Sequence, residues 1–180
     1  MKNKRGFSLL ELLIFILIVG IITIITIPIY WRSLEEAKKN SQHSNINIFT
    51  KRIEHFALKN GRYPTPQELT NILNDSNYFS EIPKCPYNGK SYTLAISLSN
   101  FRNAMQNNNF NNANILYYEA SKITYTLWYY PPKFYIGNKI SKIFHYPWCW
   151  TLPSPVNQVL LPSREEAIEK SFTSCSNCKP

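Results

Sequence analysis

Apolar residues fill the first part of the chain almost without a break. Residues 7–30 contain one charge, Glu11, and a helix of about 24 such residues would be about 36 Å long. That length is enough to cross a hydrocarbon core of about 30 Å. The basic segment before it predicts that the N-terminus stays in the cytoplasm and that the rest of the chain lies outside. A secretory signal peptide is the alternative, but residues 27–31 are bulky and offer no small-residue cleavage site.

After Tyr30 the apolar residues recur every three or four positions. This spacing predicts that the same helix continues, with a polar face, to about Lys59 and stops at Gly61. A second, short helix is predicted to begin at Thr65, because a Thr cap, a Pro and then Glu68 form a capping-box pattern.

Alternating patterns in the next stretch predict three strands, over residues 91–98, 115–118 and 123–129. The Asn-rich segment 106–114 between them lacks an apolar period and is predicted to be a loop. We expect a small antiparallel sheet packed on the long helix, and hence an α+β fold. No nucleophile with a base and an acid, no Gly-rich phosphate loop and no paired carboxylates occur in this stretch, so the chain is not expected to be an enzyme or to take a small-molecule substrate.

Glu11 is costly inside a bilayer and is therefore expected to have a partner. If the chain were cut after Gly6, the new amine of Phe7 would lie one helical turn from Glu11. Amine and carboxylate of neighbouring subunits could then neutralise each other and favour lateral assembly. The run Gly-Phe-Ser-Leu-Leu-Glu at residues 6–11 resembles the prepilin-peptidase site of type IV pilins and pseudopilins. The resemblance implies cleavage between Gly6 and Phe7, methylation of Phe7, and Glu11 as the assembly carboxylate.

Four metal-type side chains appear near the end of the chain. His145 and Cys149 form an H-x3-C pair, and Cys175 and Cys178 form a C-x2-C pair. One imidazole and three thiolates make a full tetrahedral set for zinc, and a closed set of four indicates a structural site. A disulfide among these cysteines is the alternative, because exported proteins meet an oxidising environment. Cys85 is left out of the set and is expected in a turn, as a free thiol or a small packing residue.

The C-terminal segment also resembles the metal-binding domain of the Ada DNA-repair family. The similarity runs through residues 138–145, 162–168 and 172–178, where Ser163 would cap a helix and Glu166 would complete its capping box. The Ada protein has a nucleophilic cysteine where this chain has His145. A zinc-bound imidazole cannot accept a methyl group as a thiolate does, so methyl-transfer repair is excluded and a zinc-stabilised accessory module is expected.

Charge and aromatic content leave a second function open. The chain has 20 Lys and Arg against 11 Asp and Glu, a net charge of +9 that would fall to +6 without residues 1–6. Aromatic residues concentrate between positions 128 and 150, near Lys133, Lys139 and Lys142. They could stack on DNA bases or simply fill a small core and a domain junction. The alternative function is therefore a membrane-anchored DNA-binding protein of DNA uptake that uses residues 133–180.

The sequence as a whole predicts four parts: a leader (1–6), a transmembrane half-helix (7–30), a pilin-like head (31–132) and a zinc-binding module (133–180). The predicted function is a structural subunit, a minor pilin or pseudopilin, of a type IV pilus, type II secretion or competence filament. Its expected partners are other pilin subunits, the prepilin peptidase and the assembly machinery. The precursor is expected in the cytoplasmic membrane and the mature chain in an extracytoplasmic filament. The module, with fewer than 50 residues, is expected to fold only with its metal, while the head survives metal loss on its own core.

Overall fold

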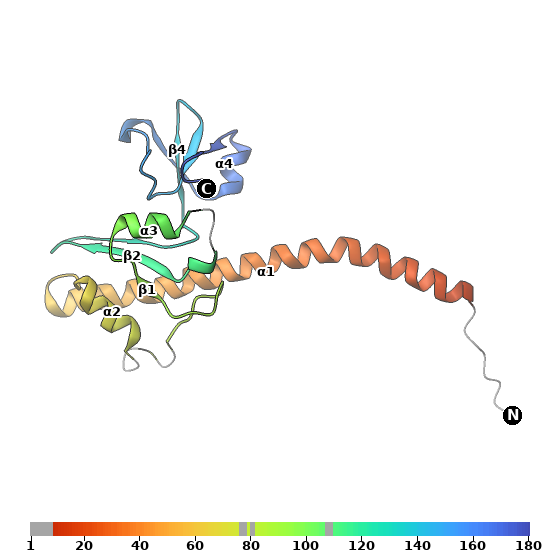
Figure 1. Ribbon diagram of the computed structural model, residues 1–180, viewed down its shortest axis with the longest axis horizontal. Coiled ribbons are helices and arrows are strands. Elements are labelled where there is room, and N and C mark those ends of the chain that lie inside the picture. Colours follow the sequence, from red (N-terminus) through yellow and green to blue (C-terminus); the bar gives the residue numbers. More distant parts are fainter. Residues whose placement is uncertain (1–8, 76–78, 80–81, 107–109) are drawn as a thin grey trace. The chain divides into compact units, whose positions relative to one another are not determined.

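A computed structural model describes residues 9–75, 79, 82–106 and 110–180 (Figure 1). The chain divides into two compact units, one that ends at Asn40 and one from Ser41 to Pro180. Gly6 and Phe7, the predicted processing residues, lie outside the described residues.

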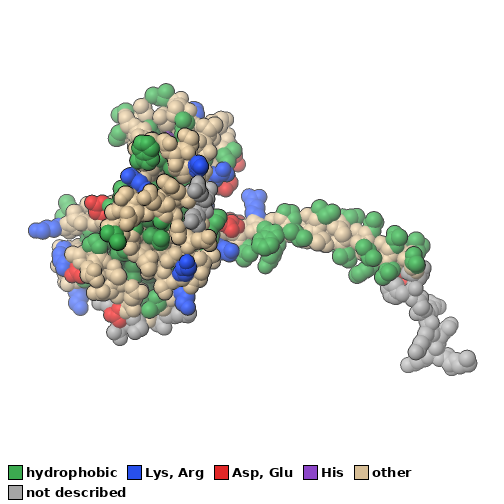
Figure 2. All heavy atoms as spheres, viewed as in Figure 1, with side chains coloured by type: hydrophobic (Ala, Val, Ile, Leu, Met, Phe, Trp, Pro, Cys, Tyr) green, Lys and Arg blue, Asp and Glu red, His purple; other side chains and the backbone are tan. Residues whose placement is uncertain are grey.

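The long helix α1 spans Leu9–Asn60 and includes Pro28. Its first part is apolar and exposed, as the hydrophobic side chains along it in Figure 2 show. Among the helices in the described ranges, α1 has a stretch long and apolar enough to cross a membrane. Gly61 follows the helix with φ +66°, a conformation that favours glycine, and its N–H donates to Ala57 O at 2.8 Å. The predicted helix and its stop signal are confirmed.

The second half of α1 turns one face into the unit 41–180. Gln42, Ile46, Phe49 and Ile53 are buried at helical spacing. Gln42 is the polar member of this row. Its Nε2 donates to Ala113 O at 2.9 Å and to Tyr130 O at 3.0 Å, so a side-chain amide ties the helix to two later backbone segments.

Helix α2 (Pro66–Asn74) begins as its sequence predicts. Thr65 N donates to Glu68 Oε2 at 2.7 Å, and Glu68 N donates to Thr65 Oγ1 at 3.3 Å, which completes the capping box. Arg62 donates two hydrogen bonds to the Glu68 carboxylate at 2.7 and 2.8 Å. These bonds, with that from Thr65 N, lower the pKa of Glu68 to about 2. Leu69, Ile72 and Leu73 are buried beneath the helix.

The first sheet has the order β1-β2-β3, built from β1 (Thr93–Leu94), β2 (Ile115–Ala120) and β3 (Tyr125–Trp128). It is mixed rather than wholly antiparallel, because β1 pairs with β2 in parallel. The strand predicted over residues 91–98 shrinks to two residues. The alternation misleads there because Ser97 accepts a hydrogen bond from Asn100 N and starts helix α3 (Leu98–Ala104). A short 3-10 turn, η1 (Phe110–Asn112), precedes β2.

A second sheet lies in the C-terminal part, with the order β6-β4-β5-β7. Its elements in chain order are β4 (Tyr135–Asn138), β5 (Ile143–His145), the 3-10 turn η2 (Pro155–Asn157), β6 (Gln158–Leu161), helix α4 (Arg164–Glu169) and β7 (Thr173–Ser174). Ser163 caps α4 as predicted, by accepting from Glu166 N at 3.1 Å. The Glu166 carboxylate accepts from Lys170 Nζ at 2.6 Å instead of completing the predicted capping box.

One hydrophobic core runs through residues 41–180. Buried residues of α1, α2 and the first sheet belong to the same cluster as those of the second sheet. Trp148 makes much of this connection, because its ring packs edge-on to Phe101 at 5.1 Å between centroids. Its carbonyl oxygen also accepts a hydrogen bond from Arg102 Nε at 2.6 Å. The chain from His145 to Cys149 is thus held against α3.

Candidate metal centre

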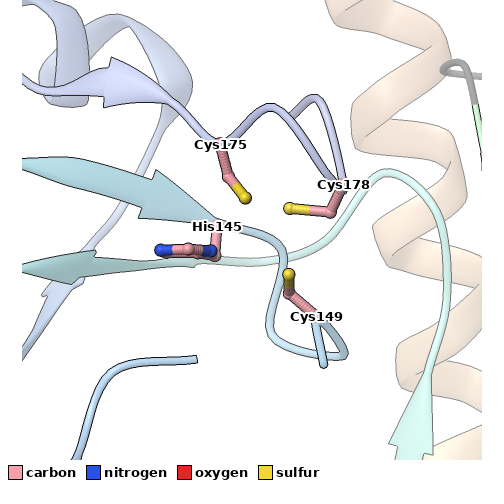
Figure 3. A group of neighbouring side chains, drawn as sticks. All are labelled: His145, Cys149, Cys175 and Cys178. Atoms are coloured by element: carbon pink, nitrogen blue, oxygen red, sulfur yellow. The ribbon is translucent and has the colours of Figure 1, made fainter. Parts of the chain in front are cut away.

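The four side chains predicted as metal ligands converge on one point (Figure 3). His145 ends strand β5, Cys149 follows in the next turn, and Cys175 and Cys178 lie just after strand β7. Their ligand atoms all lie within 4.8 Å of one another. His145, Cys149 and Cys175 are buried, and Cys178 is half-buried.

Local backbone bonds explain why residues so distant in the sequence meet. Strands β5 and β7 pair in parallel, so the chain leaves both at the same end of the sheet. Cys175 N donates to Phe144 O at 3.0 Å, which continues this pairing up to the ligands. Tight turns then place the second member of each pair: Cys149 N donates to Tyr146 O at 3.0 Å, and Lys179 N donates to Cys175 O at 2.9 Å.

The group fits a tetrahedral zinc ion. With Zn–S bonds of about 2.3 Å, the sulfur atoms of a tetrahedral site stand about 3.8 Å apart, so ligand atoms within 4.8 Å need move little. His145 Nδ1 is buried and has no hydrogen-bond partner among the described residues. A buried ring nitrogen without a partner is costly unless something else binds it, and a metal ion would. A bound zinc would act there as a structural cross-link with all four positions filled by protein.

Thr151 is a contact that the sequence motif did not reveal. Its Oγ1 lies 3.2 Å from Cys149 Sγ and 3.6 Å from Cys175 Sγ, so one hydroxyl touches two of the proposed ligands. Hydroxyl donors to ligand sulfur orient the ligands and moderate their charge. A Thr two residues after a Cys belongs to no recognised ligand pattern, and only the folded turn brings it to the site.

Proton sharing makes one of the thiols acidic even without a metal. The Cys178 thiol donates a hydrogen bond to Cys149 Sγ, and this bond lowers the pKa of Cys149 below that of a free thiol. The hydrogen bond to Cys149 holds the proton on Cys178, and this bond, together with burial, raises the pKa of Cys178. The pair therefore favours one thiolate, the form in which cysteine binds zinc.

The other predicted site residues lie elsewhere. Cys85 is buried, with 1% of its surface exposed, and is not a member of the metal group. It lies in a turn, as predicted, where its carbonyl oxygen accepts from Gly89 N at 2.8 Å. Burial raises the pKa of its thiol. Glu11 stands in the exposed first turn of α1.

Most aromatic side chains of the C-terminal part serve in packing. Tyr135, Phe144, Tyr146 and Trp148 are buried, whereas Trp150 is 71% exposed. Tyr146 and Trp148 stack on each other at 4.9 Å between ring centroids. The structure therefore favours the packing account of these rings over a stacking surface for DNA.

Comparisons with family models match both ends of the chain. Residues 1–27 match the prokaryotic N-terminal methylation motif, and residues 129–180 match the metal binding domain of Ada. The first match covers the predicted processing site and Glu11. The second covers the four converging side chains.

Whole-protein comparisons identify the relatives. The type II secretion system core protein G of Dickeya chrysanthemi is 31% identical over 107 residues, which are 52% of this chain and 69% of that protein. The protein of the same name from Escherichia coli K12 is 27% identical over 105 residues, 51% of this chain and 72% of its own length. A ComG operon protein 3 homolog of Bacillus licheniformis is 31% identical over 99 residues, 54% of this chain and 93% of the relative. No solved structure matches. With its prepilin-type N-terminus, its long apolar helix and these relatives, the chain belongs to the pilin-like pseudopilin family of type II secretion core protein G and the ComG proteins.

Proposed function

We propose that this pseudopilin is a membrane-anchored precursor that is processed after Gly6 and assembled with other pilin-like subunits into an extracytoplasmic filament. We further propose that its C-terminal module holds one structural zinc ion through His145, Cys149, Cys175 and Cys178. The observation that carries the zinc proposal is the convergence of these four ligand atoms within 4.8 Å.

Several features support zinc over a disulfide. Three sulfur atoms and a ring nitrogen are the preferred ligands of structural zinc sites. A disulfide would use two of the three sulfurs and leave His145 Nδ1 buried without a partner. Zinc binding contributes on the order of 10 kcal/mol of folding free energy in small structural sites, which suits a short segment with little apolar surface of its own to bury.

Processing and assembly are expected at the N-terminus. The methylation-motif match supports cleavage between Gly6 and Phe7 by a prepilin peptidase, and methylation of Phe7. Glu11 lies in the first turn of a helix whose apolar side chains are exposed. Helices of neighbouring subunits would cover such a surface, and the Phe7 amine of one would neutralise Glu11 of another. The basic residues before the helix support an N-terminus inside and a filament outside.

The accessory module favours a minor subunit. The related pseudopilins align with only about half of this chain, and the Ada-type match occupies residues 129–180. A repeating shaft packs identical subunits closely, so a large addition on every subunit would be difficult to accommodate. A low-copy position, at a tip or as an accessory, meets no such constraint.

Metal analysis of the purified chain, with thiol counting in the absence of reductant, tests the zinc proposal. We expect one zinc per chain, and three cysteines, Cys149, Cys175 and Cys178, that react with a thiol reagent only after a chelator is added. The Cys178→Ser chain should lose stoichiometric zinc, and the Cys85→Ser chain is the matched control that should keep it. Metal-free protein with a disulfide among the three cysteines would overturn the proposal.

Mass spectrometry of the mature protein tests the processing proposal. We expect a methylated Phe7 as the first residue. An intact Met1, or a cut beyond Tyr30, in assembled material would overturn the membrane-anchored filament role while leaving the zinc proposal untouched.

A further inference from the structure

A cavity of about 330 Å³ lies between helix α1 and strand β3. Ile46, Asn47 and Thr50 of α1 line one side, and residues of β3 line the other. Pro132 to Phe134 and the pair Pro147 and Trp148 complete the wall. Neither the proposed zinc binding nor the proposed filament assembly uses this cavity. We call it the aromatic slot.

Two tyrosine contacts limit the length of the aromatic slot. The Tyr125 side chain at the start of β3 lies close to Thr50 of α1. Just past the end of β3, the Tyr129 hydroxyl lies 3.0 Å from His43 Nδ1. From His43 to Thr50 the helix rises about 10 Å. A slot of this length fits one ring-sized group better than a polypeptide strand passing through.

Aromatic rings form the body of the slot. Trp128 stands 6.4 Å from Phe134 and 6.3 Å from Trp148, measured between ring centroids. Trp148 is fixed in the core, so this wall exists before any ligand arrives. Rings held edge-on and tilted to one another offer faces and edges that suit a flat aromatic group.

The charge at the slot selects among aromatic ligands. Among the described residues that line the slot, Lys133 is the charged one and is exposed, and Asn47 adds a neutral amide. Within the part of the chain that the structure describes, no carboxylate lines the slot to balance a cation. An ammonium at the rim of an apolar slot favours an anionic group beside the ring, since a carboxylate would pair with it.

We propose that the aromatic slot binds an aromatic ring carrying a carboxylate one to three bonds away. Two sources supply this chemistry: a free aromatic carboxylate, or the last residue of a peptide that ends in an aromatic side chain. In both cases the ring enters between Trp128 and α1 while the carboxylate meets Lys133. This ligand site goes beyond the filament and zinc roles, and its test depends on neither.

Ligand-observed 19F NMR with 6-fluoro-2-naphthoate, on the full-length chain in detergent micelles, tests the proposal. We expect saturable line broadening with one site per chain. Lys133→Gln should weaken binding about fivefold, the effect of losing one exposed ion pair. Asn47→Phe should abolish binding by filling the slot from the exposed face of α1. Ser44→Phe places the same ring on an exposed helix position outside the lining and is the matched control, in the same micelles.

Two further probes identify the charge requirement and the source. The uncharged 6-fluoro-2-naphthalenemethanol should bind several-fold more weakly than the naphthoate. The tripeptide acetyl-Ala-Ala-Phe is tested with a free C-terminal carboxylate and with a C-terminal amide. Displacement of the naphthoate by the carboxylate form alone would assign the site to peptide ends. Failure of both peptides would assign it to free aromatic carboxylates.

Three results would overturn the proposal. One is wild-type binding by a folded Asn47→Phe chain, and another is equal binding of the naphthoate and the alcohol. The third is that the chain binds a dT oligonucleotide but not the naphthoate, and that Asn47→Phe abolishes the oligonucleotide binding. This result would identify the slot as a nucleic-acid site.

Discussion

Replacement of Gln42 by Met tests whether a buried amide holds α1 to the rest of residues 41–180. Gln42 is completely buried, and its Nε2 satisfies the carbonyl oxygens of Ala113 and Tyr130. Its Oε1 accepts a hydrogen bond from the Tyr92 hydroxyl. Methionine has nearly the same length and shape, so the substitution removes these bonds without opening a large cavity.

The expected loss follows from the groups left behind. Each buried polar group without a partner costs about 1–3 kcal/mol. The Tyr92 hydroxyl keeps its contact with Asn45 Nδ2 at 3.1 Å, so the two carbonyl oxygens dominate. After a gain of about 1 kcal/mol from burying the more apolar Met side chain, we expect Gln42→Met to lower the free energy of unfolding by about 1–5 kcal/mol.

Urea unfolding of the full-length chain in detergent, followed by tryptophan fluorescence, measures this loss. Trp128 and Trp148 both lie in the unit 41–180 and report on its core. Ser44→Met makes the same side chain at an exposed position of α1, and it should change stability by less than about 0.5 kcal/mol. A Gln42→Met chain as stable as the Ser44→Met chain would refute the reasoning.

The remaining predictions concern assembly, packing and the metal. Glu11→Ala should leave membrane insertion intact and prevent incorporation into filaments; normal filament levels on immunoblots of sheared material would contradict the pairing of amine and carboxylate. Cys85→Ser buries a hydroxyl in place of a thiol and should cost about 1–3 kcal/mol in urea unfolding with unchanged zinc content. Gly137→Ala would place a Cβ 2.7–2.9 Å from three packed side chains, and the overpacking should lower stability by about 1–3 kcal/mol; an unchanged melting temperature would show that they move aside. Chelation of the metal should change the near-ultraviolet circular dichroism signal to which the packed Trp148 and Phe101 rings contribute. An unchanged spectrum would mean that the segment 145–149 needs no metal to keep its packing.

Local signals in the sequence predicted the elements that depend on local chemistry. The capping box of Thr65 and Glu68, the stop at Gly61 and the apolar run of α1 each depend on neighbours a few residues away. The convergence of the four metal-type side chains was also predictable, because H-x3-C and C-x2-C spacings constrain the chain strongly. The strand predicted over residues 91–98 was mostly wrong, because alternation alone does not distinguish a strand from the start of a helix. The hydroxyl of Ser97 caps helix α3 and so favours the helix.

Long-range contacts were beyond the reach of such patterns. A glutamine on the core face of a helix reads as a flaw in the apolar pattern until its partners, Ala113 and Tyr130, are known. The sequence also led us to expect a head that survives metal loss on its own core. The packing of Trp148 on Phe101 and the hydrogen bond from Arg102 connect the head and the C-terminal module through a shared core. Metal loss should therefore destabilise both. The aromatic slot has the same origin, since α1, β3 and residues 132–148 meet only in the folded chain.

The proposed metal centre would also have a mechanical consequence if a pulling force acted on this part of the chain. With zinc bound, His145 and Cys178 are tethered to the same ion, so a pulling force cannot draw out the chain between them until a metal–ligand bond ruptures. That chain of about 33 residues would measure about 110 Å when fully extended. A bound zinc would therefore keep this segment from extending. The segment would lengthen in one discrete step, when a metal–ligand bond breaks.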